Sequence, residues 1–157
     1  MPTHNIVVKT TDVLRVAETS ATAPGFGSEN LGPIFERLVP IVLARIHESD
    51  ARPHIMVAWY EEPDDDGSVI LHAGFDIEDQ PVVSDDQVRV VELPIVEVAS
   101  VIHRGTMDNI EAAYETLVRW VEDSGYQLTG RSRELYHQHD HTNPTQNVTE
   151  LQLPITT

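Results

Sequence analysis

The chain has 157 residues, a length that suits one domain built around one hydrophobic core. Its formal net charge is −16, and no basic stripe interrupts the acidity, which argues against direct binding to nucleic acid. It contains no cysteine, which excludes disulfides, thiolate metal sites and cysteine nucleophiles.

The sequence shows no segment that would direct the chain to a membrane. Residues 1–9 lack the charged start and apolar run of a signal peptide. No stretch approaches the roughly 18 apolar residues that a membrane span requires. We therefore expect a cytoplasmic protein with no membrane partner.

Hydrophobic periodicity divides the first half into strands around one helix. Apolar residues at helical spacing predict a helix from about Leu31 to His47, with an expected kink at Pro40. Alternating and β-branched segments predict strands over residues 5–9, 13–21, 55–61 and 69–77. A polar stretch over residues 78–87 connects these elements to the second half.

The second half repeats the order of the first. Its predicted elements are strands over 88–93 and 96–103, a helix over 107–123, a strand or hairpin arm over 127–138, and a strand over 148–155. The order strand, helix, strand, strand thus occurs twice, in pseudo-repeats of about 1–80 and 86–157. This duplication predicts a single α+β domain over residues 1–157. We expect a curved antiparallel sheet with two helices on one face and a central groove as the ligand site.

Several short motifs of the second half occur in an order that resembles a known family. They are Val98-Ala99, His103-Arg104-Gly105, Ala113-Tyr114, Gly125-Tyr126, Glu134-Leu135-Tyr136 and a closing segment from Val148 to Ile155. The pattern resembles gyrase-inhibitor-like (GyrI-like) domains, which also form the effector-binding domains of AraC-type and MerR-type multidrug-responsive activators. The resemblance covers residues 96–156, and the first half matches mainly by its order of elements.

The resemblance implies a bacterial, cytoplasmic domain whose pocket accepts diverse cationic and aromatic compounds. It implies Glu134 as the electrostatic anchor of that pocket, and it implies no cofactor. The first predicted strand begins almost at Met1, so we expect a stand-alone domain without the DNA-binding domain of the activators. Sheet edges at both ends of the chain leave a protein partner or a homodimer open.

The candidate ligand-binding residues are Glu134, Tyr136, Tyr60, Trp59, Phe26 and Tyr114. Glu134 and Tyr136 are two residues apart on a predicted strand, so their side chains point to the same side. Tyr60 occupies the pseudo-symmetric position to Tyr136, so it either flanks the groove or lies in the core with its hydroxyl in water. Periodicity alone favours a solvent-facing strand residue at Glu134, and the pocket role is what the resemblance implies.

The other three aromatic candidates have structural explanations as well. Trp59 points to the opposite face from Tyr60 unless a bulge shifts the strand by one residue. Tyr114 belongs to the apolar stripe of the second helix, where aromatics are more often core, and Trp120 is assigned to the core. Phe26 lies in a loop rich in glycine and proline, where it could close over the pocket or plug the sheet edge.

Two clusters resemble metal sites only superficially, and we assign no metal. His137, His139 and His141 alternate, but they have the opposite parity to Glu134 and lie where the strand ends, so a solvated turn is the better interpretation. The acidic run over residues 61–66 lacks the spacing of a calcium loop and suits a solvated hairpin turn.

Three functions compete on this evidence. The preferred one is a small-molecule-binding protein that sequesters or senses a cationic or aromatic drug or toxin. The second is a hydrolase of strained, cyclopropane-bearing or similarly electrophilic toxins, in which Glu134 activates water or protonates the strained ring. The third is a gyrase-inhibitor-type protein–protein regulator, with which the charge of −16 is compatible. No catalytic residue is assigned beyond Glu134, because a single carboxylate without an evident partner base gives only weak support for catalysis.

Overall fold

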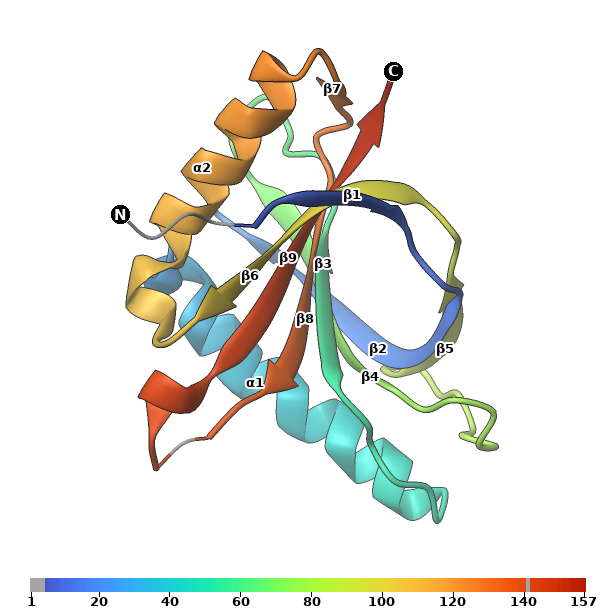
Figure 1. The fold of residues 1–157 in the computed structure, drawn as a ribbon. Helices are drawn as coiled ribbons and strands as arrows, with labels where there is room; N and C mark the ends of the chain where they lie inside the picture. The colour runs from blue at the N-terminus through green and yellow to red at the C-terminus, as the bar shows by residue number, and fades with distance from the viewer. Residues whose placement is uncertain (1–4, 141) are drawn as a thin grey trace.

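A computed structural model describes residues 5–140 and 142–157 of the chain. It shows an α+β fold in which a large, curved, unclosed antiparallel sheet carries two helices (Figure 1). The predicted fold class is therefore confirmed. No helix of the described residues is long and apolar enough to span a bilayer.

The elements follow one another in an order close to the predicted one. The strands are β1 (Val7–Thr10), β2 (Leu14–Ala23), β3 (Met56–Tyr60), β4 (Val69–Asp76), β5 (Arg89–Leu93), β6 (Glu97–Arg104), β7 (Gln127–Leu128), β8 (Ser132–Gln138) and β9 (Val148–Thr156). The helices are α1 (Ser28–Glu48) and α2 (Ile110–Asp123), with short 3-10 turns η1 (Met107–Asn109) and η2 (Pro144–Gln146).

Two elements differ from the prediction. The segment 127–138 is not one arm but two strands, separated by a turn in which Gly130 has a φ of +85°, a value that favours glycine. Helix α1 begins at Ser28 rather than near Leu31, so that Pro33 lies inside the helix together with Pro40.

The order of the strands in the sheet shows the duplication directly. Each half contributes a strand–helix–strand–strand unit, β2-α1-β3-β4 and β6-α2-β8-β9. The sheet order is β1-β6-β9-β8-β3-β4-β2-β5, and β7 pairs with β9. The strands of the second unit therefore lie in the reverse of the order found in the first unit, and the two units meet at the central pair β3–β8. In that pair, Ala58 lies directly opposite Glu134.

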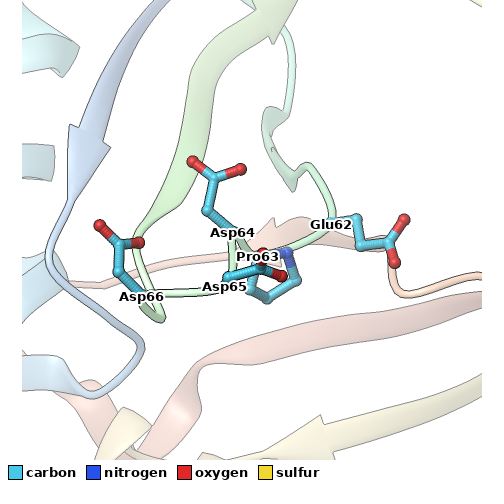
Figure 2. Close-up of a pocket in the computed structure, with 5 residues that line it drawn as sticks. All are labelled: Glu62, Pro63, Asp64, Asp65 and Asp66. Carbon is cyan, nitrogen blue, oxygen red and sulfur yellow. The ribbon is translucent and has the colours of Figure 1, made fainter.

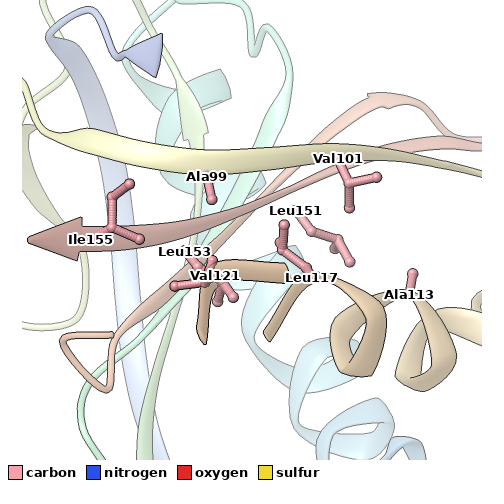
Figure 3. Close-up of a cluster of buried hydrophobic side chains, with 8 residues drawn as sticks. All are labelled: Ala99, Val101, Ala113, Leu117, Val121, Leu151, Leu153 and Ile155. Carbon is pink, nitrogen blue, oxygen red and sulfur yellow. The ribbon is translucent and has the colours of Figure 1, made fainter. Parts of the chain in front are cut away.

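Both helices lie on the same face of the sheet because each has an apolar stripe to bury. Helix α2 buries Ala113, Leu117 and Val121 against strands β6 and β9, as Figure 3 shows. Helix α1 buries Leu38 against one group of side chains of the first unit, and Val42 and Ile46 against another. The helices are thus fixed to the two wings of the sheet, and the region above the centre is left to the site described below.

The face of the sheet opposite the helices buries a network of charged side chains. His72 on β4 lies between two carboxylates, with Nδ1 2.7 Å from Glu18 and Nε2 2.7 Å from Glu61. Its ring stacks on Trp59 at a centroid distance of 4.8 Å, and Arg89 adds a second cation 3.1 Å from Glu18. Burial opposes the charge on His72, but the two carboxylates outweigh burial and raise its pKa. Burial likewise opposes the charge on Glu18, yet His72 and Arg89 lower its pKa.

A second charged cluster on the same face surrounds Glu150 of β9. Burial disfavours its charge, but Gln152, Lys9, His137 and Ser100 donate to the carboxylate and lower its pKa to about 2. The Nζ atom of Lys9 lies 2.6 Å from Glu150. The two buried carboxylates on this face, Glu18 and Glu150, therefore have cationic partners, whereas the buried guanidinium of Arg133 donates to the Pro94 carbonyl.

We predict that the His72 cluster stabilises the fold in a defined pH range. Because the pKa of His72 is raised on folding, its contribution is complete below the ordinary value of 6.5 and is lost as the pH rises through the higher folded pKa. The His72→Gln variant should therefore lose more unfolding free energy at about pH 6 than at about pH 9. Urea denaturation at both pH values measures this difference.

The exposed ion pair between His54 and Glu78 provides a matched control, since its atoms are 2.6 Å apart but both side chains are largely solvated. His54→Gln should change stability little at either pH. A pH-independent loss in His72→Gln would contradict the prediction.

Candidate functional site

Glu134 lies at the centre of the sheet, on the face that carries the helices. Alternation along β8 places Ser132, Glu134 and Tyr136 on this face, as the sequence predicts. The cross-strand partner of Glu134 is Ala58, whose methyl group leaves space above the strand. The Glu134 residue is only 5% exposed, so a carboxylate is held at the floor of the site largely out of bulk water.

Three tyrosine hydroxyls converge on this carboxylate. Tyr60 and Tyr136 donate to Oε1 at 2.9 and 2.5 Å, and Tyr114 donates to Oε2 at 2.7 Å. They come from three different elements, since Tyr60 ends β3, Tyr136 lies on β8 and Tyr114 lies on α2. Hydrogen bonds to an ionised group are roughly twice as strong as those between neutral groups, which offsets part of the cost of burying the charge.

The environment of the three phenols keeps them protonated. Burial raises the pKa of Tyr60, Tyr114 and Tyr136 well above the ordinary value of 10, and the charge of Glu134 raises each one further. A phenol in this state is a hydrogen-bond donor and not a nucleophile. The three tyrosines therefore serve to hold the carboxylate.

The charge of Glu134 is held without a positive partner. None of the ion pairs within residues 5–140 and 142–157 involves Glu134. A carboxylate has about four acceptor positions, and the three phenols occupy three of them, which leaves one on Oε2. Glu134 thus differs from Glu18 and Glu150, whose negative charges are matched by cations.

A cavity of about 1290 Å³ opens above Glu134 between the two helices. It is larger than the roughly 300–1,000 Å³ of most small-molecule sites. Apolar side chains of α1 and α2 form much of its walls, among them Leu31, Phe35, Ile110 and Val118. The predicted groove between the helices is present.

The charged side chains that line this cavity are mainly acidic. Its six carboxylates are Glu29, Glu36, Asp108, Glu111, Glu115 and Glu134. The cavity is also lined by one arginine, Arg131, and by three histidines. The ligand-binding residues predicted from the sequence did not include Glu29 and Glu36, although their separation of seven residues places them on the same side of one helix.

The structure brings five of the six predicted ligand-binding residues to the cavity. Glu134, Tyr136, Tyr60 and Tyr114 form the hydrogen-bonded cluster, and Phe26 lines the mouth. The Phe26 ring meets the Tyr60 ring edge-on at 5.6 Å and is 49% exposed. Trp59 is the exception: β3 contains no bulge, so Trp59 points to the opposite face, where it stacks on His72. We therefore remove it from the candidate site.

The two described histidines after β8 lie in different surroundings. Their parity was expected to turn them away from the groove, and the imidazole of His137 does so, because it lies 2.8 Å from Glu150 on the face away from the helices, although the residue also borders the cavity. His139 differs from the prediction: it follows the irregularity between Tyr136 and Gln138, lines the cavity and meets the ring of Tyr136 edge-on at 5.1 Å. His141 lies outside the described residues.

The acidic run after β3 forms the predicted exposed hairpin turn. It surrounds a shallow hollow, in which the Glu62 carboxylate points away from those of Asp64 and Asp66 (Figure 2). Ser68 donates its hydroxyl to Asp66 at 2.6 Å, as expected of a turn that satisfies itself. Among the described residues, no group of acidic and histidine side chains is arranged to hold a metal ion.

Comparison with known families and structures gives this arrangement its context. The model of the GyrI-like small-molecule-binding domain matches residues 32–156, which is most of the chain. The chain therefore belongs to the GyrI-like small-molecule-binding domain family. Comparison with curated protein sequences gives no match.

Solved structures share the fold at low sequence identity. The C-terminal domain of EcmrR has a TM-score of 0.74 and 20% identity over 98% of both chains. In the EcmrR–DNA complex the TM-score is 0.77 at 19% identity, with 98% of this chain but only 58% of the longer EcmrR chain covered. SAV2435 bound to tetraphenylphosphonium has a TM-score of 0.65 and 12% identity, over 97% and 94% of the chains. A hydrolase from Listeria innocua has a TM-score of 0.62 and 12% identity, over 99% and 94%.

We predict that Glu134 governs the ionisation of the three buried phenols. In Glu134→Gln the negative charge is lost while the burial remains, so the pKa values of Tyr60, Tyr114 and Tyr136 should fall but stay above 10. Ultraviolet absorbance titration of tyrosinate in the folded protein measures the change.

Glu92→Gln removes an exposed carboxylate on β5, outside the cavity, and should leave the titration curve unchanged. Identical curves for wild type and Glu134→Gln would show that the three hydroxyls do not surround this carboxylate.

Proposed function

We propose that this protein binds cationic, aromatic small molecules in the cavity above Glu134 and sequesters or senses them. The observation that carries the proposal is the uncompensated negative charge of Glu134, held at the floor of a large, mainly apolar cavity. In such an environment charges interact more strongly than in water, so a ligand cation supplies the partner that the fold leaves out.

The aromatic rings around the carboxylate support the same ligand class. Tyr60, Tyr114 and Tyr136 direct their hydroxyls to Glu134, and Phe26 lies against Tyr60 at the mouth. A cation near an aromatic face gains roughly 0.5 to 2 kcal/mol, depending on how far it is desolvated. The acidic walls add a field that concentrates cations at the entrance.

The size of the cavity suits loose recognition. A volume of about 1290 Å³ accommodates bulky ligands without close contact on every side. Two related structures are consistent with this proposal: that of SAV2435 is described as bound to tetraphenylphosphonium, and EcmrR carries the same fold in its C-terminal domain. We infer a domain that tolerates several ligands of one charge class.

A pair of ions with equal shape and opposite charge tests the proposal. Tetraphenylphosphonium should bind the wild-type protein, whereas tetraphenylborate should not, as measured by isothermal titration calorimetry. Glu134→Gln should weaken tetraphenylphosphonium binding at least about tenfold, which corresponds to about 1.4 kcal/mol.

The control is Glu92→Gln, which changes the net charge equally but lies outside the cavity, and it should bind as wild type does. Binding of both ions with similar affinity, or tetraphenylphosphonium binding that survives Glu134→Gln, would rule out the proposed recognition.

Hydrolysis of an electrophilic ligand is a second candidate, favoured by the acceptor position left on Glu134 Oε2. A water bound there would lose a proton to Glu134 as its oxygen attacks a strained cyclopropane carbon. One ring C–C bond would break as the C–O bond forms, and the proton would pass to the opened product. The tyrosines would remain protonated and position the carboxylate.

We expect this reaction, if the protein performs it, to depend entirely on Glu134. Incubation with a cyclopropane-bearing alkylating compound should then give a ring-opened product heavier by one water, detected by mass spectrometry. Glu134→Gln should abolish its formation above the uncatalysed rate, while Glu92→Gln should not. Recovery of the unchanged compound from wild-type protein would leave binding as the function.

A further inference from the structure

Helix α1 contains two prolines, Pro33 and Pro40, within one continuous helical segment. Proline has no backbone N–H, so the carbonyl four residues earlier loses its usual helical donor. For Pro40, that carbonyl belongs to Glu36. The proline ring also crowds this carbonyl and displaces it outward from the helix.

The position of this carbonyl follows from the residues on either side of it. Glu36 and Pro40 are both exposed residues, and both line the cavity. Residues four apart lie above one another on the same face of a helix, with the carbonyl of the first between them. Helix geometry therefore places the Glu36 carbonyl oxygen on the α1 wall of the cavity.

The Glu36 carbonyl and the Glu134 carboxylate offer a ligand different interactions. The carboxylate already accepts three hydrogen bonds, so it offers its charge and one remaining acceptor position on Oε2. The Glu36 carbonyl offers no net charge, but it is a strong acceptor whose ordinary donor is missing. The cavity thus contains a charge subsite at its floor and a hydrogen-bond subsite on its α1 wall.

We propose that the Glu36 backbone carbonyl, bared by Pro40, accepts a hydrogen bond from the ligand. This inference rests on the proposed function and deepens it by naming a ligand class. The preferred ligands are aromatic cations that carry N–H donors, such as primary or secondary ammonium and amidinium ions. Quaternary cations carry no N–H donor and gain nothing from this subsite.

Substitution of Pro40 by alanine restores the backbone N–H and pairs it with the Glu36 carbonyl. Pro40→Ala should therefore weaken binding of a biphenylmethylammonium ion by roughly three- to tenfold, the usual net effect of one hydrogen bond. It should change binding of the N-trimethylated analogue by less than about twofold. Calorimetric titration of both cations measures the difference between the two effects.

The chain offers three controls for this experiment. Pro33→Ala makes the same change at the other proline of the helix, where the carbonyl concerned is that of Glu29. Glu29 lines the cavity but Pro33 does not, so we expect this carbonyl to lie at the edge of the lining and the variant to affect neither cation. Glu36→Gln removes the side-chain charge but keeps the carbonyl, so it should weaken both cations equally. Pro40→Gly also restores the N–H and should reproduce the selective loss seen in Pro40→Ala.

The outcomes separate this inference from the proposed function. If neither cation binds wild-type protein, the proposed function fails. If both bind in a Glu134-dependent manner but Pro40→Ala affects them equally, or affects neither, the carbonyl subsite is wrong while the proposed function stands. Alanine is a far better helix former than proline, so we expect Pro40→Ala to be folded, and a thermal unfolding curve checks this.

Discussion

The structure of this domain depends on one buried negative charge that is stabilised by neutral donors. Glu134 accepts hydrogen bonds from three phenols, and burial keeps those phenols protonated. The sheet supplies two of the tyrosines and α2 supplies the third, so the cluster joins the two halves and ties α2 to the central strands. The fold thereby holds a carboxylate in a largely dry place without neutralising it.

The buried carboxylates on the two faces of the sheet have different partners. On the face away from the helices, Glu18 and Glu150 are matched by His72, Arg89 and Lys9, which makes those clusters structural. On the helix face, Glu134 has no cation among the described residues, and a cavity opens above it. Since an unmatched buried charge is costly, its retention beside an open cavity supports a role in ligand binding.

Duplication explains why the site lies where it does. The two units meet in reversed order at β3 and β8, so the centre of the sheet is covered by neither helix. Tyr60 and Tyr136 approach the centre from equivalent positions, whereas the position equivalent to Glu134 is occupied by Ala58. One half therefore provides the charge and the other half provides the space beside it. The pair of opposed helices then forms the walls, and a proline in α1 adds a backbone acceptor to one of them.

The sequence by itself determined the element order, the α+β class and the face shared by Glu134 and Tyr136, because strand and helix periodicities are local properties. It left the face of Trp59 open and turned His139 away from the groove, because the presence or absence of a bulge depends on pairing with a neighbouring strand. Only the tertiary structure decided that three hydroxyls from three elements meet one carboxylate. That convergence depends on how α2 packs across strands distant in sequence, and the resemblance that singled out Glu134 carried no information about its partners.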